Sequence, residues 1–128
     1  MRLILAITLI LAAIATAADN KKQITERRIV GTWKTGGPGG YSHWEDTRIY
    51  SPSKHFYHIF KGFKPDGEVS SSYTSFGVFR IEDDGNITEV TDGSTGEGKL
   101  VVDWLDDNSF MGIIRDGPPM LYRRVESK

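Results

Sequence analysis

Short strand-like runs separated by turn signals make up this chain from residue 29 onward. Each turn signal is a cluster of Gly, Pro, Asp, Asn or Ser, the residues that supply the backbone angles and local hydrogen bonds of tight turns. A chain interrupted this often is restricted to short elements. The seven clusters are GGPGG (36–40), SPSK (51–54), KPDG (64–67), DDGN (83–86), DGSTGEG (92–98), DDNS (106–109) and DGPP (116–119).

The eight runs between these turns have the composition of β-strands. They are rich in Val, Ile, Phe, Tyr, Trp and Thr, and none has a sustained 3.6-residue period. Short strands at regular spacing predict an antiparallel barrel or a sandwich. The predicted strands are 29–35, 41–50, 55–63, 68–82, 86–91, 99–105, 110–115 and 120–126.

Closure of these strands into a barrel is the arrangement that leaves no sheet edge exposed. We therefore predict an all-β fold for residues 29–128, a small eight-stranded antiparallel up-and-down β-barrel. The first strand must then pair with the last, which places Trp33 near Arg123 and Arg124 at a closed end. Because neighbouring side chains of a strand alternate, only one of these arginines can lie on the indole and form a cation–π contact.

Two local features add detail to this prediction. In KPDG, Pro65 fixes the backbone of the first turn residue, and Gly67 can adopt the left-handed conformation that closes a hairpin. The next run, 68–82, is long for one strand. Its serines at 70–72 therefore predict a bend or a bulge.

Residues 1–18 have the pattern of a secretory signal peptide. One basic residue precedes an apolar run over 3–14, and small residues follow it, so we predict cleavage after Ala17 or Ala18. The run is shorter than the roughly 20 residues of a membrane span, although a retained anchor is the alternative. The sequence thus predicts a secreted or periplasmic protein without membrane attachment. Residues 19–28 form a polar N-terminal arm, either one or two helical turns or a loose segment.

Charge and cysteine content limit the possible partners and chemistry. After removal of Arg2 with the signal peptide, 15 basic and 17 acidic side chains remain, a net charge near −2. This balance predicts no general attraction to nucleic acid or to anionic membranes. The chain has no cysteine, so core packing and backbone pairing must hold the domain without disulfides.

Three short motifs resemble those of short bacterial secreted lipocalin-like domains, which belong to the calycin superfamily. The motifs are GTWK (31–34), FKPDG (63–67) and LYRR (121–124). The resemblance spans nearly the whole mature chain. It implies a lipocalin-like barrel that takes up a small apolar or amphipathic molecule at the end opposite Trp33, with Gly31 and Trp33 as structural positions.

Two narrower resemblances are not carried over to function. Fatty-acid-binding proteins hold a carboxylate with an Arg-x-Tyr pair on the last strand, whereas Tyr122 and Arg124 stand here in the reverse order. The glycines after GTW are also similar to the opening of the haem-binding nitrobindins. Those proteins ligate haem through a C-terminal His, and this chain has no His after His58. No cofactor is therefore predicted.

Few residues suggest catalysis or metal binding. His43 and Glu45 share one strand face, but zinc normally takes three or four protein ligands, so we predict no metal site. The chain contains no recognisable nucleophile elbow, and most acidic clusters fall in turns, so we predict no catalytic residues and a non-enzymatic function. The enzymatic alternative requires an inward polar cluster such as His58 with Glu45 and Tyr73.

Aromatic residues concentrated in the middle of the chain leave two functions open. Phe56, His58 and Phe60 share one face of the strand 55–63, and Tyr57 lies on the other. If the inward aromatics leave a pocket, the barrel binds a small ligand. If they fill the core, the outer aromatic face binds a protein partner or a second copy. The predicted pocket lining is Tyr57 (or Phe56), Tyr73, Phe79, Trp104 and Tyr122.

Overall fold

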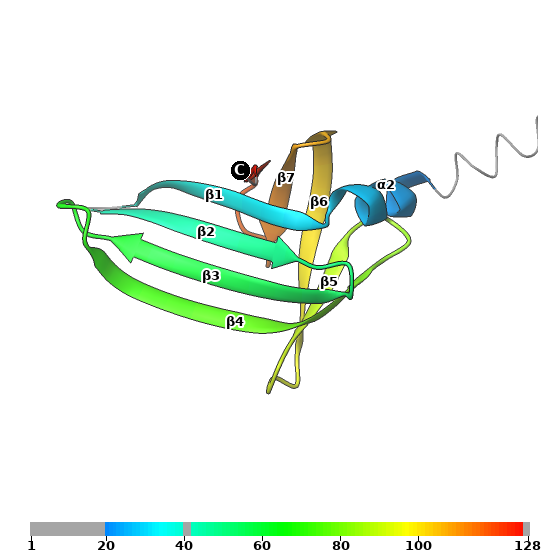
Figure 1. The fold of residues 1–128 in the computed structure, drawn as a ribbon, viewed down its shortest axis with the longest axis horizontal. Helices are drawn as coiled ribbons and strands as arrows, with labels where there is room; N and C mark the ends of the chain where they lie inside the picture. The colour runs from blue at the N-terminus through cyan, green and yellow to red at the C-terminus, as the bar shows by residue number, and fades with distance from the viewer. Residues whose placement is uncertain (1–19, 40–41, 127–128) are drawn as a thin grey trace, which may run out of the picture.

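The computed structural model describes residues 20–39 and 42–126, which form one closed antiparallel β-barrel (Figure 1). Each strand pairs with the next in chain order, and the first pairs with the last. The predicted eight-stranded up-and-down barrel is thereby confirmed. The strands are β1 (Gly31–Gly39), β2 (Ser42–Tyr50), β3 (His55–Phe63), β4 (Val69–Ile81), β5 (Ile87–Thr91), β6 (Glu97–Asp106), β7 (Ser109–Ile114) and β8 (Met120–Arg124).

The predicted signal peptide, residues 1–18, lies outside the described residues. Within the described part of the chain, no helix combines the length and apolar character needed to cross a membrane.

The strands β1 to β4 are longer than the closed part of the barrel requires. Pairing of β1 with β8 involves only Trp33 and Lys34 of β1, and β4 meets β5 only from Gly77 to Ile81. The remaining lengths of β1 to β4 therefore project beyond the closed part as a curved four-stranded sheet (Figure 1). We call this projection the extended sheet.

The prediction that GGPGG forms a turn from residue 36 onward is wrong, because β1 continues to Gly39. A Cβ atom on Gly36 would lie 2.6 Å from the backbone oxygen of Trp44 on β2. The glycine therefore permits a close approach of two paired strands, and its role here is not to reverse the chain.

The β3–β4 hairpin follows the turn chemistry of its sequence. Gly67 has a positive φ of 92°, and its N–H donates to the carbonyl of Lys64 at 2.9 Å. Further along β4, Gly62 faces Ser71 and Phe63 faces Val69, which leaves Ser70 as an extra residue. The bulge predicted within 70–72 therefore falls at Ser70.

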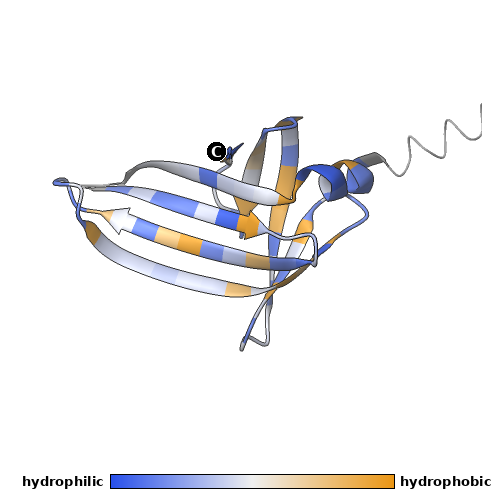
Figure 2. Cartoon of the chain, in the orientation of Figure 1, coloured by the Kyte–Doolittle hydropathy of each residue, from blue (hydrophilic) through white to orange (hydrophobic). Residues whose placement is uncertain are grey.

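The polar N-terminal arm folds as a helix, α2 (Asn20–Arg28), against one end of the barrel. The helix is mostly hydrophilic (Figure 2) and is attached mainly through polar contacts. The buried Thr25 hydroxyl donates to the carbonyl of Gly85 at 2.7 Å and accepts from Nε1 of Trp104 at 2.9 Å. An ion pair between Arg28 and Asp107, at 2.7 Å, joins the helix to the β6–β7 turn.

The core is centred on Trp33, which is fully buried next to this helix. Its indole makes edge-on contacts with Trp104 and Phe110 at centroid distances of 5.5 and 5.0 Å, and its Nε1 donates to the carbonyl of Ile29 at 2.8 Å. The other buried hydrophobic residues extend this core along the barrel. They are Ile29, Tyr50, Phe56, Phe79, Ile81, Ile87, Leu100, Phe110 and Tyr122.

Candidate functional site

A cavity of about 840 Å³ lies on the concave side of the extended sheet. Inward residues of β2, β3 and β4 form one wall. The β5–β6 hairpin, the turn after β7 and the start of β8 form the other. The cavity begins beside the core residues Phe56 and Leu100 and extends along the strands that reach past the closed part of the barrel.

Aromatic rings cover the wall formed by the extended sheet. Trp44 and Phe60 stack with their centroids 6.3 Å apart, and Phe60 lies 5.8 Å from Tyr73. All three line the cavity. This wall offers an apolar surface to a bound molecule.

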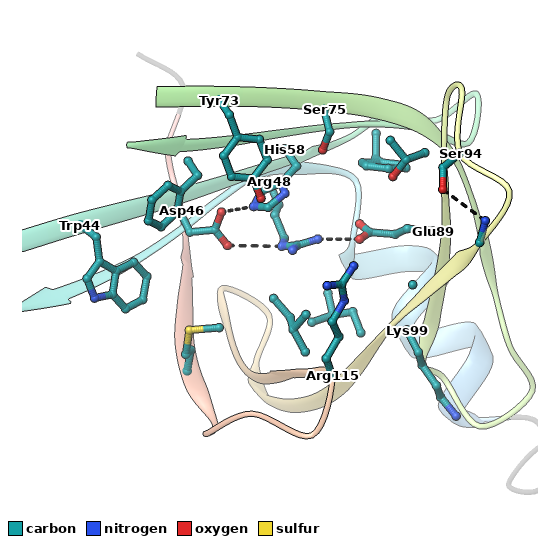
Figure 3. A pocket seen from close by; sticks show the side chains of 18 of the residues that line it. Trp44, Asp46, Arg48, His58, Tyr73, Ser75, Glu89, Ser94, Lys99 and Arg115 are labelled. Atoms are coloured by element: carbon teal, nitrogen blue, oxygen red, sulfur yellow. Dashed lines mark hydrogen bonds and ion pairs between the residues drawn. The ribbon is translucent and has the colours of Figure 1, made fainter. Parts of the chain in front are cut away.

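A charged cluster of Asp46, Arg48, His58 and Glu89 lines the same cavity (Figure 3). Asp46 and Arg48 are two residues apart on β2 and therefore point to the same side, while His58 faces Arg48 across the β2–β3 pair. The side chains of Asp46 and Arg48 are only 5% and 4% exposed.

Ion pairs and hydrogen bonds connect the members of the charged cluster. His58 Nε2 is hydrogen-bonded to Asp46 Oδ1. Arg48 donates from Nη1 to Glu89 Oε1 at 2.6 Å, and its Nε lies 3.5 Å from Asp46 Oδ2. Arg48 thus lies between two carboxylates.

Two buried tyrosines support the cluster from the core side. Tyr50 donates its hydroxyl to Glu89 Oε2, and Tyr122 donates to Asp46 Oδ2, each at 2.7 Å. The ring of Tyr122 stacks on Phe110 at 5.0 Å, which fixes its position. Each carboxylate oxygen of Asp46 and Glu89 therefore accepts a hydrogen bond from the protein.

The surroundings shift the pKa values of these groups in the directions expected for a buried ionic network. Burial raises the pKa of Asp46, but the hydrogen bond from His58 and the charge of Arg48 outweigh it, so the pKa lies below its ordinary value. Burial, then the nearby charge of Glu89, raise the pKa of Tyr50. Burial likewise raises the pKa of Tyr122. At neutral pH Asp46 is therefore ionised, and Tyr50 and Tyr122 are neutral.

Arg48 has more hydrogen-bond donors than the described residues use. Its Nε makes no hydrogen bond, because the contact with Asp46 at 3.5 Å is an ion pair without hydrogen-bond geometry. Five N–H bonds are available on a guanidinium, and the described partners accept one hydrogen bond, through Nη1. The cavity thus has spare donors at a buried positive group.

Among the predicted pocket residues, Tyr73 and the alternative Phe56 line the cavity. Trp104 and Tyr122 do not line the cavity, because they pack against Trp33 and Phe110 beside α2 and in the core. Phe79 is buried against Tyr50 at 5.0 Å. Tyr57 is half exposed on the outer face, because it alternates with Phe56 and His58 along β3.

The predicted structural residues meet where β1 leaves α2. The guanidinium of Arg124 lies 4.3 Å from the ring centroid of Trp33 and donates to the carbonyls of Val30 and Arg28. A Cβ on Gly31, whose φ is 138°, would lie 2.6 Å from Nη1 of Arg124. Arg123 is exposed on the opposite face of β8.

The structure corrects one member of the inward cluster proposed from sequence. Glu45 points away from His58 and pairs with Lys34 at 3.1 Å, because side chains alternate along β2. Its neighbour Asp46 occupies the inward position. Tyr73 does lie edge-on to His58, at a centroid distance of 5.5 Å.

The predicted pocket lining did not include Asp46, Arg48 and Glu89. The one available signal was an acidic and a basic residue two positions apart on a predicted strand, which places Asp46 and Arg48 on the same face. His43, weighed as a metal ligand with Glu45, stacks on Phe63 at 4.6 Å. Within the described residues, no group of three or more His, Asp and Glu side chains gathers to hold a metal ion.

Comparisons with known proteins add no assignment to this geometry: the chain matches no family model, no curated protein and no solved structure. The chemistry of the site is therefore derived from its own residues. An aromatic wall beside a buried charged cluster can bind a molecule that has an apolar body and a polar end.

Proposed function

We propose that this protein is an exported, non-enzymatic binding protein, a lipocalin-like carrier of a small amphipathic molecule. The observation that carries the proposal is the cavity of about 840 Å³, which has an aromatic wall and a charged cluster among its lining residues. Its volume falls within the range of roughly 300–1,000 Å³ that is typical of small-molecule sites.

The positions of the sequence motifs support the lipocalin-like assignment. GTWK begins β1 and FKPDG forms the β3–β4 hairpin, while LYRR ends β8. The first and last of these meet in the pairing of Trp33 with Arg124. GTWK and LYRR thus lie where the barrel closes, FKPDG lies at the far tip of the extended sheet, and the cavity lies away from Trp33, where the resemblance implies an open end.

The experiment uses two neighbouring residues of β4 that point to opposite faces. Ser75 lines the cavity, whereas Thr74 is exposed on the outer face. We expect the neutral fluorescent probe N-phenyl-1-naphthylamine to bind the wild type. Ser75→Trp places an indole inside the cavity and should weaken binding at least about tenfold, while Thr74→Trp should bind as the wild type does. Equal loss in both variants, or no probe binding to the wild type, would contradict the proposal.

A second candidate function is supported by the outer face of the same strands. Tyr57 and Phe76 lie side by side with centroids 5.9 Å apart, and both are about half exposed, as is Val78. An apolar outer face of this kind suits a protein partner or a second copy of the chain. Sedimentation analysis tests the second copy. A wild-type dimer that the Tyr57→Lys substitution dissociates would support self-association. A wild-type protein that is monomeric at all concentrations would contradict it.

A further inference from the structure

We propose that the polar end of the ligand is an organic anion, such as a carboxylate or a sulfonate, and that Arg48 and Arg115 bind it. This inference rests on the proposed carrier function and names the chemical class of its ligand.

Hydrogen-bond donors exceed free acceptors in the charged cluster. All four carboxylate oxygens of Asp46 and Glu89 already accept hydrogen bonds from His58, Arg48, Tyr50 or Tyr122. The guanidinium of Arg48, by contrast, lines the cavity and donates one hydrogen bond to the described residues, from Nη1 to Glu89. An uncompensated donor on a buried charged group carries a desolvation cost that a bound acceptor removes. The cluster is therefore built to receive an acceptor.

Arg115, in the turn after β7, is a second arginine at the cavity. Its side chain points into the cavity on the side where Arg48 and Glu89 are seen (Figure 3). Within residues 20–39 and 42–126, no carboxylate forms an ion pair with Arg115. A second guanidinium beside the cluster thus has its charge available for a ligand.

The remaining charges at the cavity explain why the acceptor is an anion. Lys99 pairs with Asp84 at 3.8 Å, and Glu97 accepts two hydrogen bonds from Arg80 at 3.0 Å. Among the described residues that line the cavity, Arg115 is therefore the cation that forms no ion pair. A neutral acceptor would satisfy Arg48 alone, whereas an anion also uses the charge of Arg115.

The test compares amphiphiles that share a ten-carbon chain and differ in the polar end. We expect decanoate to bind at least about tenfold more tightly than decanol, and decylamine more weakly than either, in isothermal titration calorimetry at pH 7. Arg115→Gln should weaken decanoate binding about tenfold and leave decanol binding unchanged, because one charge-assisted contact is lost. Lys61→Gln makes the same charge change on the outer face of β3 and should have no effect.

The two variants avoid the folding defect expected when Arg48 is replaced, since both residues are exposed. Equal affinity for decanoate and decanol, or no binding of decanoate, would overturn the anion inference. An Arg115→Gln variant that binds decanoate as tightly as the wild type would overturn the role of Arg115. The naphthylamine measurement then decides separately whether the carrier function itself fails, because that probe carries no charge.

Discussion

Trp33 is the single residue whose burial contributes most clearly to the closed end of the barrel. It packs on Trp104 and Phe110, and Arg124 covers its face. We expect Trp33→Ala to lower the free energy of unfolding by roughly 3–5 kcal/mol, because it leaves a large void in a packed core. Urea unfolding followed by circular dichroism measures this change.

The control for this prediction is Trp44→Ala, which removes an indole from the cavity wall, where the side chain is only half-buried. That variant should cost far less stability than Trp33→Ala. A loss below about 1 kcal/mol for Trp33→Ala would mean that the indole does not hold the barrel end.

The lowered pKa of Asp46 predicts that the stability of the protein depends on pH. Its pKa is lower in the folded protein than the ordinary value of 3.8, so its contribution to stability is present above that value. The contribution is lost as the pH falls through the lowered pKa. We expect Asp46→Asn to cost about 2 kcal/mol at pH 7, and the difference from the wild type to shrink below pH 4.

Urea unfolding at pH 7, 5 and 3 measures this difference directly. Asp103→Asn, an exposed change on β6, is the matched control and should have little effect at any of these pH values. A cost for Asp46→Asn that stays constant from pH 7 to pH 3 would contradict the ionic role of Asp46.

At the scale of the elements, Gly77 marks the point where β4 begins to pair with β5. A Cβ atom there would lie 2.0 Å from the carbonyl oxygen of Val90, a backbone atom that cannot move alone. We expect Gly77→Ala to destabilise the protein by about 1–3 kcal/mol, because the two strands must separate.

The matched control is Gly98→Ala on β6, where an added Cβ would meet its nearest atom at 3.9 Å. Thermal unfolding of both variants separates a local clash from the general effect of replacing a strand glycine. Equal shifts in the melting temperature would contradict the proposed close approach at Gly77.

The strands and turns were largely predictable from the sequence because their signals are local. Turn residues such as those of KPDG act within four positions, and alternation assigns Phe56 and Tyr57 to opposite faces without knowledge of the partner strand. The glycines from 36 to 39 misled the prediction. Glycine permits both a turn and a close approach of strands, and only the facing residue Trp44 decides between them.

At the scale of the whole molecule, the cavity and its charged cluster were beyond local signals. The cavity extends along β1 to β4 because these strands continue beyond the residues that pair with β8 and β5. The register of the strands sets the length of this extension. The hydrogen bonds that hold the cluster join residues as far apart in sequence as Asp46 and Tyr122. The inward positions of these strands also hold apolar residues. Alternation alone therefore does not predict which polar side chains contact one another.

We propose that the cavity beside the charged cluster carries a small amphipathic ligand. Native mass spectrometry of the protein purified from its own host without detergent tests this claim most directly. We expect a reproducible additional mass that is lost on denaturation and is absent from the Ser75→Trp variant purified in the same way. A bare chain mass for the wild type, or an additional mass that Ser75→Trp retains, would contradict the claim.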